Sequence, residues 1–126
     1  MLAVTFYRDA RDRIAALAAR GHADFAEQGQ DIVCAAVSAI LQAARVGLEE
    51  HAGIALRARQ RAGSMTLRWP EAARDAESVR AIVATAALAI EAIARRFPDH
   101  VQLHWRRIAT TGGKPGRKAG NKLGRR

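Results

Sequence analysis

Residues 31–50, "DIVCAAVSAILQAARVGLEE", carry the clearest secondary-structure signal in the chain. Asp31 is a favoured N-cap residue, no proline interrupts the apolar run that follows it, and Gly53 is a suitable place for a helix to stop. The pattern predicts one long helix. At about 100° per residue, its non-apolar members form a single stripe roughly 80° wide: Cys34, Ser38, Gln42, Arg45 and Glu49. We therefore expect most of the remaining circumference to be buried, with Cys34 at an accessible edge near the helix start.

The segments before this helix are less uniform. Residues 3–7, "AVTFY", are β-branched and aromatic and predict a strand, followed by a polar turn. Residues 14–20, "IAALAAR", fit a helix or a strand by composition, and we assign them as the second strand of the fold.

Two further strands and a second helix follow the first helix. Residues 54–69 alternate around a Gly-Ser turn and predict a hairpin that turns Met65, Leu67 and Trp69 to one face. Apolar residues at helical spacing then predict a helix from about Ala76 to Phe97. Residues 100–108 alternate again and predict a last strand with three apolar residues on one side: Val101, Leu103 and Trp105. Both Trp69 and Trp105 are expected in the core.

The order of elements is therefore β-β-α-β-β-α-β. It predicts an α+β fold with a largely antiparallel sheet and two helices packed on it. We expect one domain over residues 1–109 and a disordered tail over residues 110–126, which are rich in Gly, Lys and Arg. This tail holds six Lys or Arg and no acid, so that the formal charge of +9 falls to +3 for the predicted domain.

Composition limits the compartment and the chemistry. A single cysteine excludes an internal disulfide and fits a reducing cytoplasm. Charged residues soon after Met1 argue against a signal peptide, and no uninterrupted apolar run approaches the roughly 20 residues of a membrane helix. His100 and His104 lie in a predicted strand, about 13 Å apart, which is too far for one metal ion. We find no nucleotide-binding motif and expect neither metal nor cofactor.

Cys34 and His22 are candidates for a catalytic pair. A thiol with an ordinary pKa is only about 3% thiolate at pH 7, and a pKa near 6 would raise this fraction to about 90%. If Asp31 is the N-cap, Cys34 occupies the third helical position, where free N–H groups and the helix dipole favour an anion. His22 is the only histidine near it in sequence, in a loop bracketed by Gly21 and Gly29. The alternative is that Cys34 is a small buried apolar residue and His22 is incidental.

The stretch "GHADFAEQGQDIVCAAVSAI", residues 21–40, closely resembles the signature of the ribosomal-processing cysteine protease family Prp. That signature is Gly-His-Ala, a short loop with an aromatic residue, and then Gly-x-Asp-Ile-Val-Cys-Ala-Ala-Val-Ser. The matching positions are Gly21, His22, Ala23, Phe25, Gly29, Asp31, Ile32, Val33, Cys34, Ala35, Ala36, Val37 and Ser38. The resemblance extends more weakly over residues 1–108.

The resemblance implies a cysteine endopeptidase with Cys34 as the nucleophile and His22 as general base and acid. Members of the family remove a short N-terminal extension from large-subunit ribosomal protein 27, cutting after an aromatic residue. The family is cytoplasmic, uses no cofactor and tends to form homodimers. Its α+β fold agrees with the order of elements given above.

The roles of three neighbouring residues stay open at this point. Asp31 caps the helix, orients His22, or does both. Ser38 hydrogen-bonds the site or bonds back to its own helix. Phe25 lines the pocket for the aromatic residue of the substrate or only anchors the loop.

A rival hypothesis is a non-catalytic ribosome- or RNA-binding protein that uses its basic tail. Lysine and arginine on a flexible segment bind phosphate without sequence specificity. Aromatic residues that could stack on bases are scarce, which argues against specific base recognition. For the tail we favour a solubilising or ribosome-proximal extension over an RNA-reading element.

Overall fold

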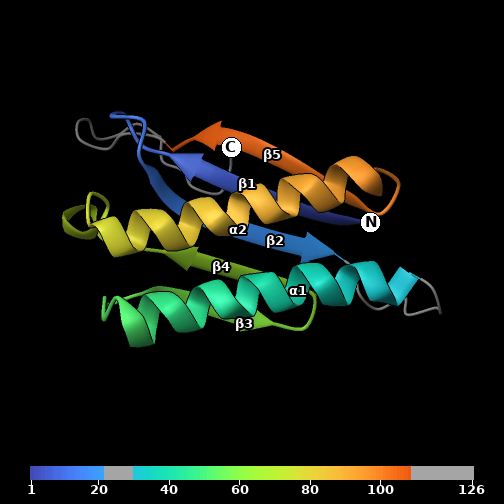
Figure 1. Ribbon diagram of the computed structural model, residues 1–126, viewed down its shortest axis with the longest axis horizontal. Coiled ribbons are helices and arrows are strands. Elements are labelled where there is room, and N and C mark those ends of the chain that lie inside the picture. The colour runs from blue at the N-terminus through green and yellow to red at the C-terminus, as the bar shows by residue number, and fades with distance from the viewer. Residues whose placement is uncertain (22–29, 109–126) are drawn as a thin grey trace.

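The computed structural model describes residues 1–21 and 30–108 of the chain. The regular elements follow the predicted order (Figure 1): β1 (Leu2–Arg8), β2 (Ile14–Gly21), α1 (Gln30–Val46), β3 (Arg57–Arg61), β4 (Ser64–Arg68), α2 (Glu77–Arg96) and β5 (Val101–Arg107). A turn of π-helix over Gly47–His51 extends α1, and a short 3-10 helix over Glu71–Ala73 precedes α2. The sequence predicted neither of these two turns.

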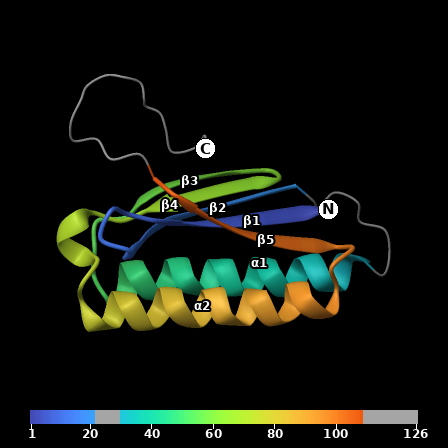
Figure 2. The same cartoon turned by 90° about the horizontal axis from the view of Figure 1, so that it is seen from above.

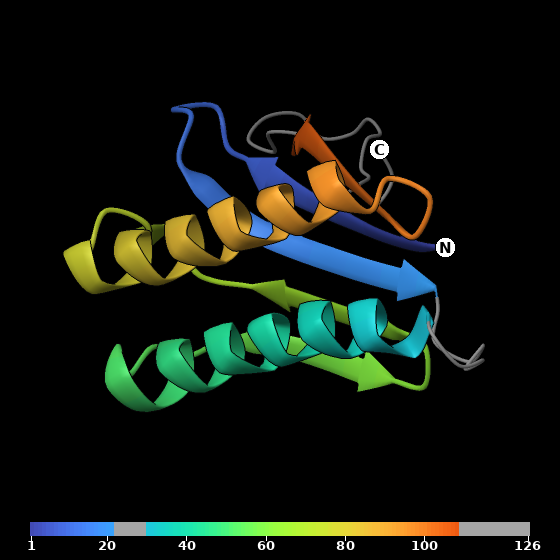
Figure 3. The same cartoon turned by 45° about the vertical axis from the view of Figure 1, so that its right-hand side comes forward.

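The five strands form one sheet in the order β3-β4-β2-β1-β5. β1 pairs in parallel with β5, and the other neighbouring strands pair antiparallel. Both helices lie on the same face of the sheet, so that the molecule has two layers (Figure 2). Figure 3 shows α1 on the side of β3 and α2 on the side of β5. The predicted α+β fold is confirmed.

β2 settles the ambiguity of residues 14–20. It is the central strand of the sheet, and Ala15, Ala16 and Leu17 are fully buried within it. A central strand is covered by neighbours on both edges and contributes apolar side chains to both faces. Its sequence therefore lacks the alternation that marked the hairpin.

The buried share of the circumference of α1 is smaller than the sequence predicted. One stripe faces the core: Val33, Val37, Leu41, Ala44 and, in the π-turn, Leu48. Most of the alanines on the rest of the helix are exposed, because within the described residues α1 packs on the sheet with one stripe and on α2 beside it (Figure 2). The prediction that most of the circumference is buried is wrong.

The two tryptophans have different environments. Trp69 is fully buried, and its indole Nε1 donates a hydrogen bond to the carbonyl of Ile14 at 2.9 Å. Trp105 is 41% exposed, so that its predicted place in the core is wrong. It lies on β5, an edge strand, where its ring stacks on Phe6 with 5.3 Å between the ring centroids. The guanidinium of Arg8 lies over the Trp105 ring, 4.4 Å from its centroid, in a cation–π contact.

A buried ion pair fastens the end of the sheet where β1 turns into β2. The carboxylate of Asp9 accepts hydrogen bonds from the backbone N–H groups of Arg11 and Arg13 and from the guanidinium groups of Arg13 and Arg74. Burial alone would raise the pKa of Asp9, but these hydrogen bonds outweigh it and lower the pKa to about 2. Asp9 is therefore an anion at neutral pH and binds the β1–β2 turn to the segment that leads into α2.

Candidate active site

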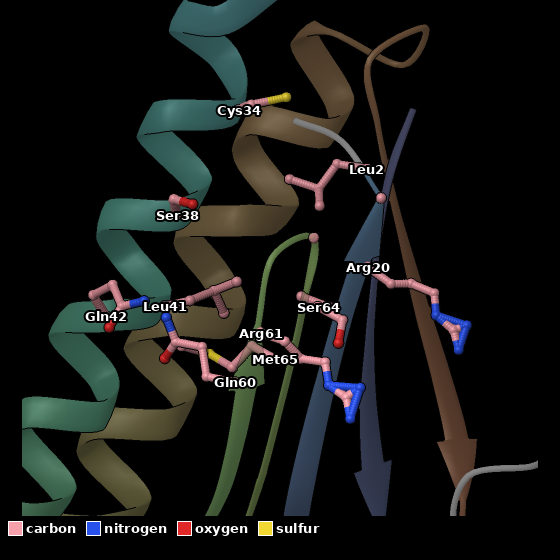
Figure 4. Close-up of a pocket in the computed structure, with 13 residues that line it drawn as sticks. Leu2, Arg20, Cys34, Ser38, Leu41, Gln42, Gln60, Arg61, Ser64 and Met65 are labelled. Atoms are coloured by element: carbon pink, nitrogen blue, oxygen red, sulfur yellow. The ribbon is translucent and has the colours of Figure 1, made fainter. Parts of the chain in front are cut away.

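A pocket of about 180 Å³ opens between α1 and the strands, at the end of the sheet where β2 stops (Figure 4). Four elements contribute to it besides β1: α1, β2, and both strands of the β3–β4 hairpin. Its lining includes both polar and apolar side chains, from Leu2, Ala19, Arg20, Gly21, Cys34, Ser38, Leu41, Gln42, Gln60, Arg61, Gly63, Ser64 and Met65. Three of its lining residues belong to the motif at residues 21–40: Gly21, Cys34 and Ser38.

The second turn of α1 places Cys34 in this pocket. Val33 and Val37 are buried beside it and fix the rotation of the helix on the sheet. Cys34 is partly buried against the same core, and in Figure 4 its sulfur points from the helix toward the strand layer near Leu2. Ser38, one helical turn further on, is exposed and lines the same pocket. Three of the five members of the stripe that the sequence defined, Cys34, Ser38 and Gln42, therefore line one wall of the site.

The pocket has an apolar floor and a polar rim. The floor consists of buried core residues: Leu2, Ala19, Leu41 and Met65. Hydroxyl and amide side chains surround it: Ser38, Gln42, Gln60 and Ser64. Such a site can take one apolar side chain while the rim hydrogen-bonds the backbone on either side of it.

Gln60 is a pocket residue that the sequence did not single out. Its Oε1 accepts a hydrogen bond from Nη1 of Arg45 at 2.9 Å, and Nε of Arg45 lies 3.5 Å from a carboxylate oxygen of Glu49. This chain of contacts joins α1 to β3 at one side of the pocket. The sequence placed Arg45 and Glu49 on the stripe with Cys34, but nothing in it paired them with a residue of the hairpin.

Gly21 forms another wall, and only glycine fits there. Its φ is +110°, and an added Cβ would lie 2.3 Å from the backbone oxygen of Met1. Its N–H donates a hydrogen bond to the carbonyl of Gly63 at 2.9 Å. The sequence predicted Gly21 at one end of the loop that contains His22, and in the structure it is the last residue of β2, held against Met1 and Gly63.

Other residues of the motif lie outside the pocket or beyond the described part of the chain. His22, Phe25 and Gly29 lie outside the described residues, which break off at Gly21, one residue before His22. Asp31 lies in the first turn of α1 and not at its cap, because the helix already begins at Gln30.

This earlier start changes the position of Cys34 in the helix. Cys34 is the fifth helical residue and not the third, so that its own N–H lies beyond the free donors of the first turn. The helix dipole also weakens beyond that turn. The expected support of a thiolate by the helix terminus is therefore smaller than the sequence predicted, and a neighbouring cation would have to supply more of it.

The described residues contain no cluster of metal-binding side chains. Among residues 1–21 and 30–108, no three His, Cys, Asp or Glu side chains form a group that could hold a metal ion. The pocket lining contains one possible ligand, the thiol of Cys34.

Comparison with known proteins supplies the family context. A family described as "Cysteine protease Prp" matches residues 1–102. The fold is similar to SMU.848 from Streptococcus mutans, with a TM-score of 0.74 and 27% identity over 85% of this chain and 95% of that one. No match was found among curated proteins.

Two further similar structures are of the essential ribosomal processing protease Prp from S. aureus, one with a substrate peptide and one with a covalently linked product peptide. Their TM-scores are 0.75 and 0.70, each at 20% identity over 83% of this chain and 99% of the other. At this level of identity the two structures support the fold.

Replacing Gly21 tests whether the end of β2 must be glycine. We expect Gly21→Ala to lower the free energy of unfolding by about 3 kcal/mol, because it combines an unfavourable φ with a backbone clash. Gly53→Ala is the matched control, since Gly53 also has positive φ (+62°) but open space around its Cβ, and should cost about 1 kcal/mol. Urea denaturation measures both, and equal losses would contradict the proposed close contact.

Proposed function

Because the chain belongs to the Prp family of cysteine proteases, we propose that it processes a ribosomal protein, with Cys34 as nucleophile and His22 as general base and acid. The substrate is the N-terminal extension of large-subunit ribosomal protein 27, cut after an aromatic residue. One observation carries the proposal: Cys34 lines the same pocket as Gly21, the residue bonded to His22. The reaction takes place in the cytoplasm, where a single cysteine remains reduced.

The chemistry proceeds in two steps. His22 takes the proton from the Cys34 thiol, the sulfur attacks the carbonyl carbon of the scissile peptide, and a C–S bond forms. The C–N bond then breaks as the imidazolium gives its proton to the leaving amine. In the second step, water attacks the thioester while His22 again takes a proton, and the released thiol recovers it. No cofactor is needed for either step.

In this proposal His22 supplies most of the activation, which the position of Cys34 in the helix supports. Since Cys34 lies in the second turn of α1, the helix terminus stabilises its thiolate only weakly. A neighbouring imidazolium lowers the pKa of a thiol by direct charge interaction, and the same group can then protonate the amine. The roles of Asp31 and Phe25 remain predictions, in which Asp31 orients His22 and Phe25 contacts the substrate. Gly29 would allow the loop to turn.

The apolar floor of the pocket supports an aromatic residue before the cut. Leu2, Leu41 and Met65 offer buried apolar surface next to Cys34, and methionine sulfur packs well against aromatic rings. Ser38 and the glutamines of the rim can hydrogen-bond the extended peptide backbone. The aromatic side chain would therefore fill the pocket while its carbonyl carbon lies at the sulfur.

Cleavage of a synthetic peptide that copies the extension tests the nucleophile. We expect Cys34→Ala to lower kcat/KM by at least about 1000-fold, because no other thiol exists in the chain. Ala35→Ser is the matched control, since Ala35 is exposed on the next position of α1 and does not line the pocket. Mass spectrometry identifies the product termini, and circular dichroism verifies that both variants fold.

Two outcomes would contradict the proposal. Cleavage by Cys34→Ala at the wild-type rate would exclude Cys34 as the nucleophile. Cleavage that does not depend on an aromatic residue before the cut would exclude the proposed specificity while leaving the protease assignment intact.

We further propose that the protein is a homodimer in which the helices of two copies meet. The face of α1 and α2 away from the sheet is apolar, with Ile32 74%, Val46 54% and Leu88 65% exposed. A shallow groove of about 430 Å³ runs between the helices and is lined by Ile40, Ala43, Ala44, Ala81, Ile82, Thr85, Ala86 and Ala89. Small side chains allow a helix of a second copy to approach closely, and a two-fold axis buries the same patch on both copies.

The composition of α1 supports this face as an interface. The segment Ile32–His51, which spans most of α1 and the π-helical turn after it, is long and apolar enough to cross a membrane by length and composition alone, although only 28% of its most apolar window is buried. The buried stripe of α1 packs on the sheet, so that a further surface must cover the apolar residues on the other side. A second copy of the same face provides it.

Light scattering after gel filtration tests the dimer. We expect Leu88→Glu to convert the dimer to a monomer, because it places a carboxylate in an apolar interface. Ala10→Glu is the matched control, since Ala10 is exposed in the β1–β2 turn and does not line the groove between α1 and α2. A monomeric wild-type protein, or a Leu88→Glu variant that stays dimeric, would contradict this interface.

A further inference from the structure

The sheet face opposite the helices, which we call the outer sheet face, is strongly basic. Alternation along the strands turns six arginines to this face, from four of the five strands: Arg20, Arg57, Arg59, Arg61, Arg68 and Arg106. Five of the six are exposed, and Arg68 is partly exposed. In Figure 4 the side chains of Arg20 and Arg61 extend away from α1, on the far side of the strands from Cys34.

No carboxylate balances these charges on the sheet. The five strands contain no Asp or Glu, and none of the six arginines forms an ion pair within residues 1–21 and 30–108. Acidic residues lie instead in the turns and on the helices, where they pair with other arginines: Asp9, Asp12, Glu49, Glu71, Asp75 and Glu91. The positive charge is therefore not spread evenly over the protein. It is concentrated on the outer sheet face, whereas the carboxylates lie on other surfaces.

Repulsion between neighbouring arginines on this face lowers the stability of the fold. An anion from outside the protein would offset it. Arg57 and Arg68 lie directly opposite each other on neighbouring strands, where like charges repel. Burial and the nearby charges of Arg74 and Arg57 lower the pKa of Arg68. A bound anion would remove this repulsion.

We infer that the outer sheet face binds the phosphate backbone of double-stranded RNA. The cations of the described chain are all arginines, whose planar guanidinium groups match phosphate oxygens in pairs. Along β3 the arginines recur every second residue, about 6.7 Å apart, and Arg57 and Arg106 lie about 19 Å apart across the sheet. This spacing spreads the contacts over several phosphates.

The centre of the face favours RNA over the other large polyanions. Thr5, Thr66 and Ser64 supply hydroxyl groups between the arginines, which can hydrogen-bond the 2′-hydroxyls in the shallow minor groove of RNA. Of the two aromatic rings on this face, Tyr7 is buried and His104 is half-buried, so that recognition follows the backbone and not the bases. The exposed large apolar side chains of the described chain lie elsewhere, which disfavours insertion into a membrane.

Fluorescence anisotropy with a short labelled RNA hairpin of mixed sequence tests the inference on the full chain. We expect Arg57→Gln combined with Arg59→Gln and Arg106→Gln to weaken binding at least about tenfold at 100 mM KCl. The slope of log Kd against log salt should fall by about 2 to 3, as expected for three lost phosphate contacts. The matched control carries three substitutions on α2, Arg80→Gln, Arg95→Gln and Arg96→Gln, and removes the same charge from the other layer. It should change Kd less than about twofold.

Each other outcome overturns the inference. Equal loss in both triple variants would mean that net charge alone attracts RNA, and unchanged binding in both would assign binding to residues 110–126. Tighter binding to a DNA duplex of the same sequence would exclude recognition of the RNA hydroxyls. If the outer-face variant lost binding to phosphatidylserine vesicles but retained RNA binding, the outer sheet face would be assigned to membranes. Thermal melting of both variants within a few degrees of the wild type ensures that the comparison concerns folded protein.

Discussion

The close approach of Gly21 to Met1 is the constraint on which the rest of the site depends. The two residues are at the end of β2 and the start of β1, where the backbone leaves no space for a side chain. Because β2 is held there, the chain must leave the sheet at the wall of the pocket that contains Cys34. The position of Cys34 relative to the end of β2 thus follows from strand pairing, together with the buried valines that fix the rotation of the helix.

The sequence predicted most of this architecture because its signals are local. Alternation located the β3–β4 hairpin, with Met65, Leu67 and Trp69 buried as expected, and helical spacing located α2 to within one residue at each end. The motif around Cys34 predicted the family, and the family match over residues 1–102 confirms it. The predicted division into domains at residue 109 stays a prediction.

What the sequence missed depends on contacts between distant segments. The α1 alanines and Trp105 are exposed because, among residues 1–21 and 30–108, no further layer covers the helices or the edge strand, and periodicity does not reveal this. The bond from Arg45 to Gln60 joins elements that are unrelated in sequence pattern. The basic outer face required knowledge of the strand register, because its arginines come from four separate strands.

The two layers divide the proposed tasks among separate surfaces. In these proposals, cleavage takes place at the edge between the layers, the helices meet a second copy, and the outer sheet face binds RNA. A dimer formed through the helices would present two basic faces directed away from each other. Such a particle could hold two peptide sites near RNA without either partner blocking the pocket.

The pH dependence of Cys34 alkylation by iodoacetamide tests the central claim, that His22 and not the helix terminus activates the thiol. We predict that wild-type protein reacts with a midpoint well below the ordinary thiol pKa of about 8.5, and that His22→Ala moves the midpoint up to about that value. Identical profiles in the two proteins, at any midpoint, would contradict the account.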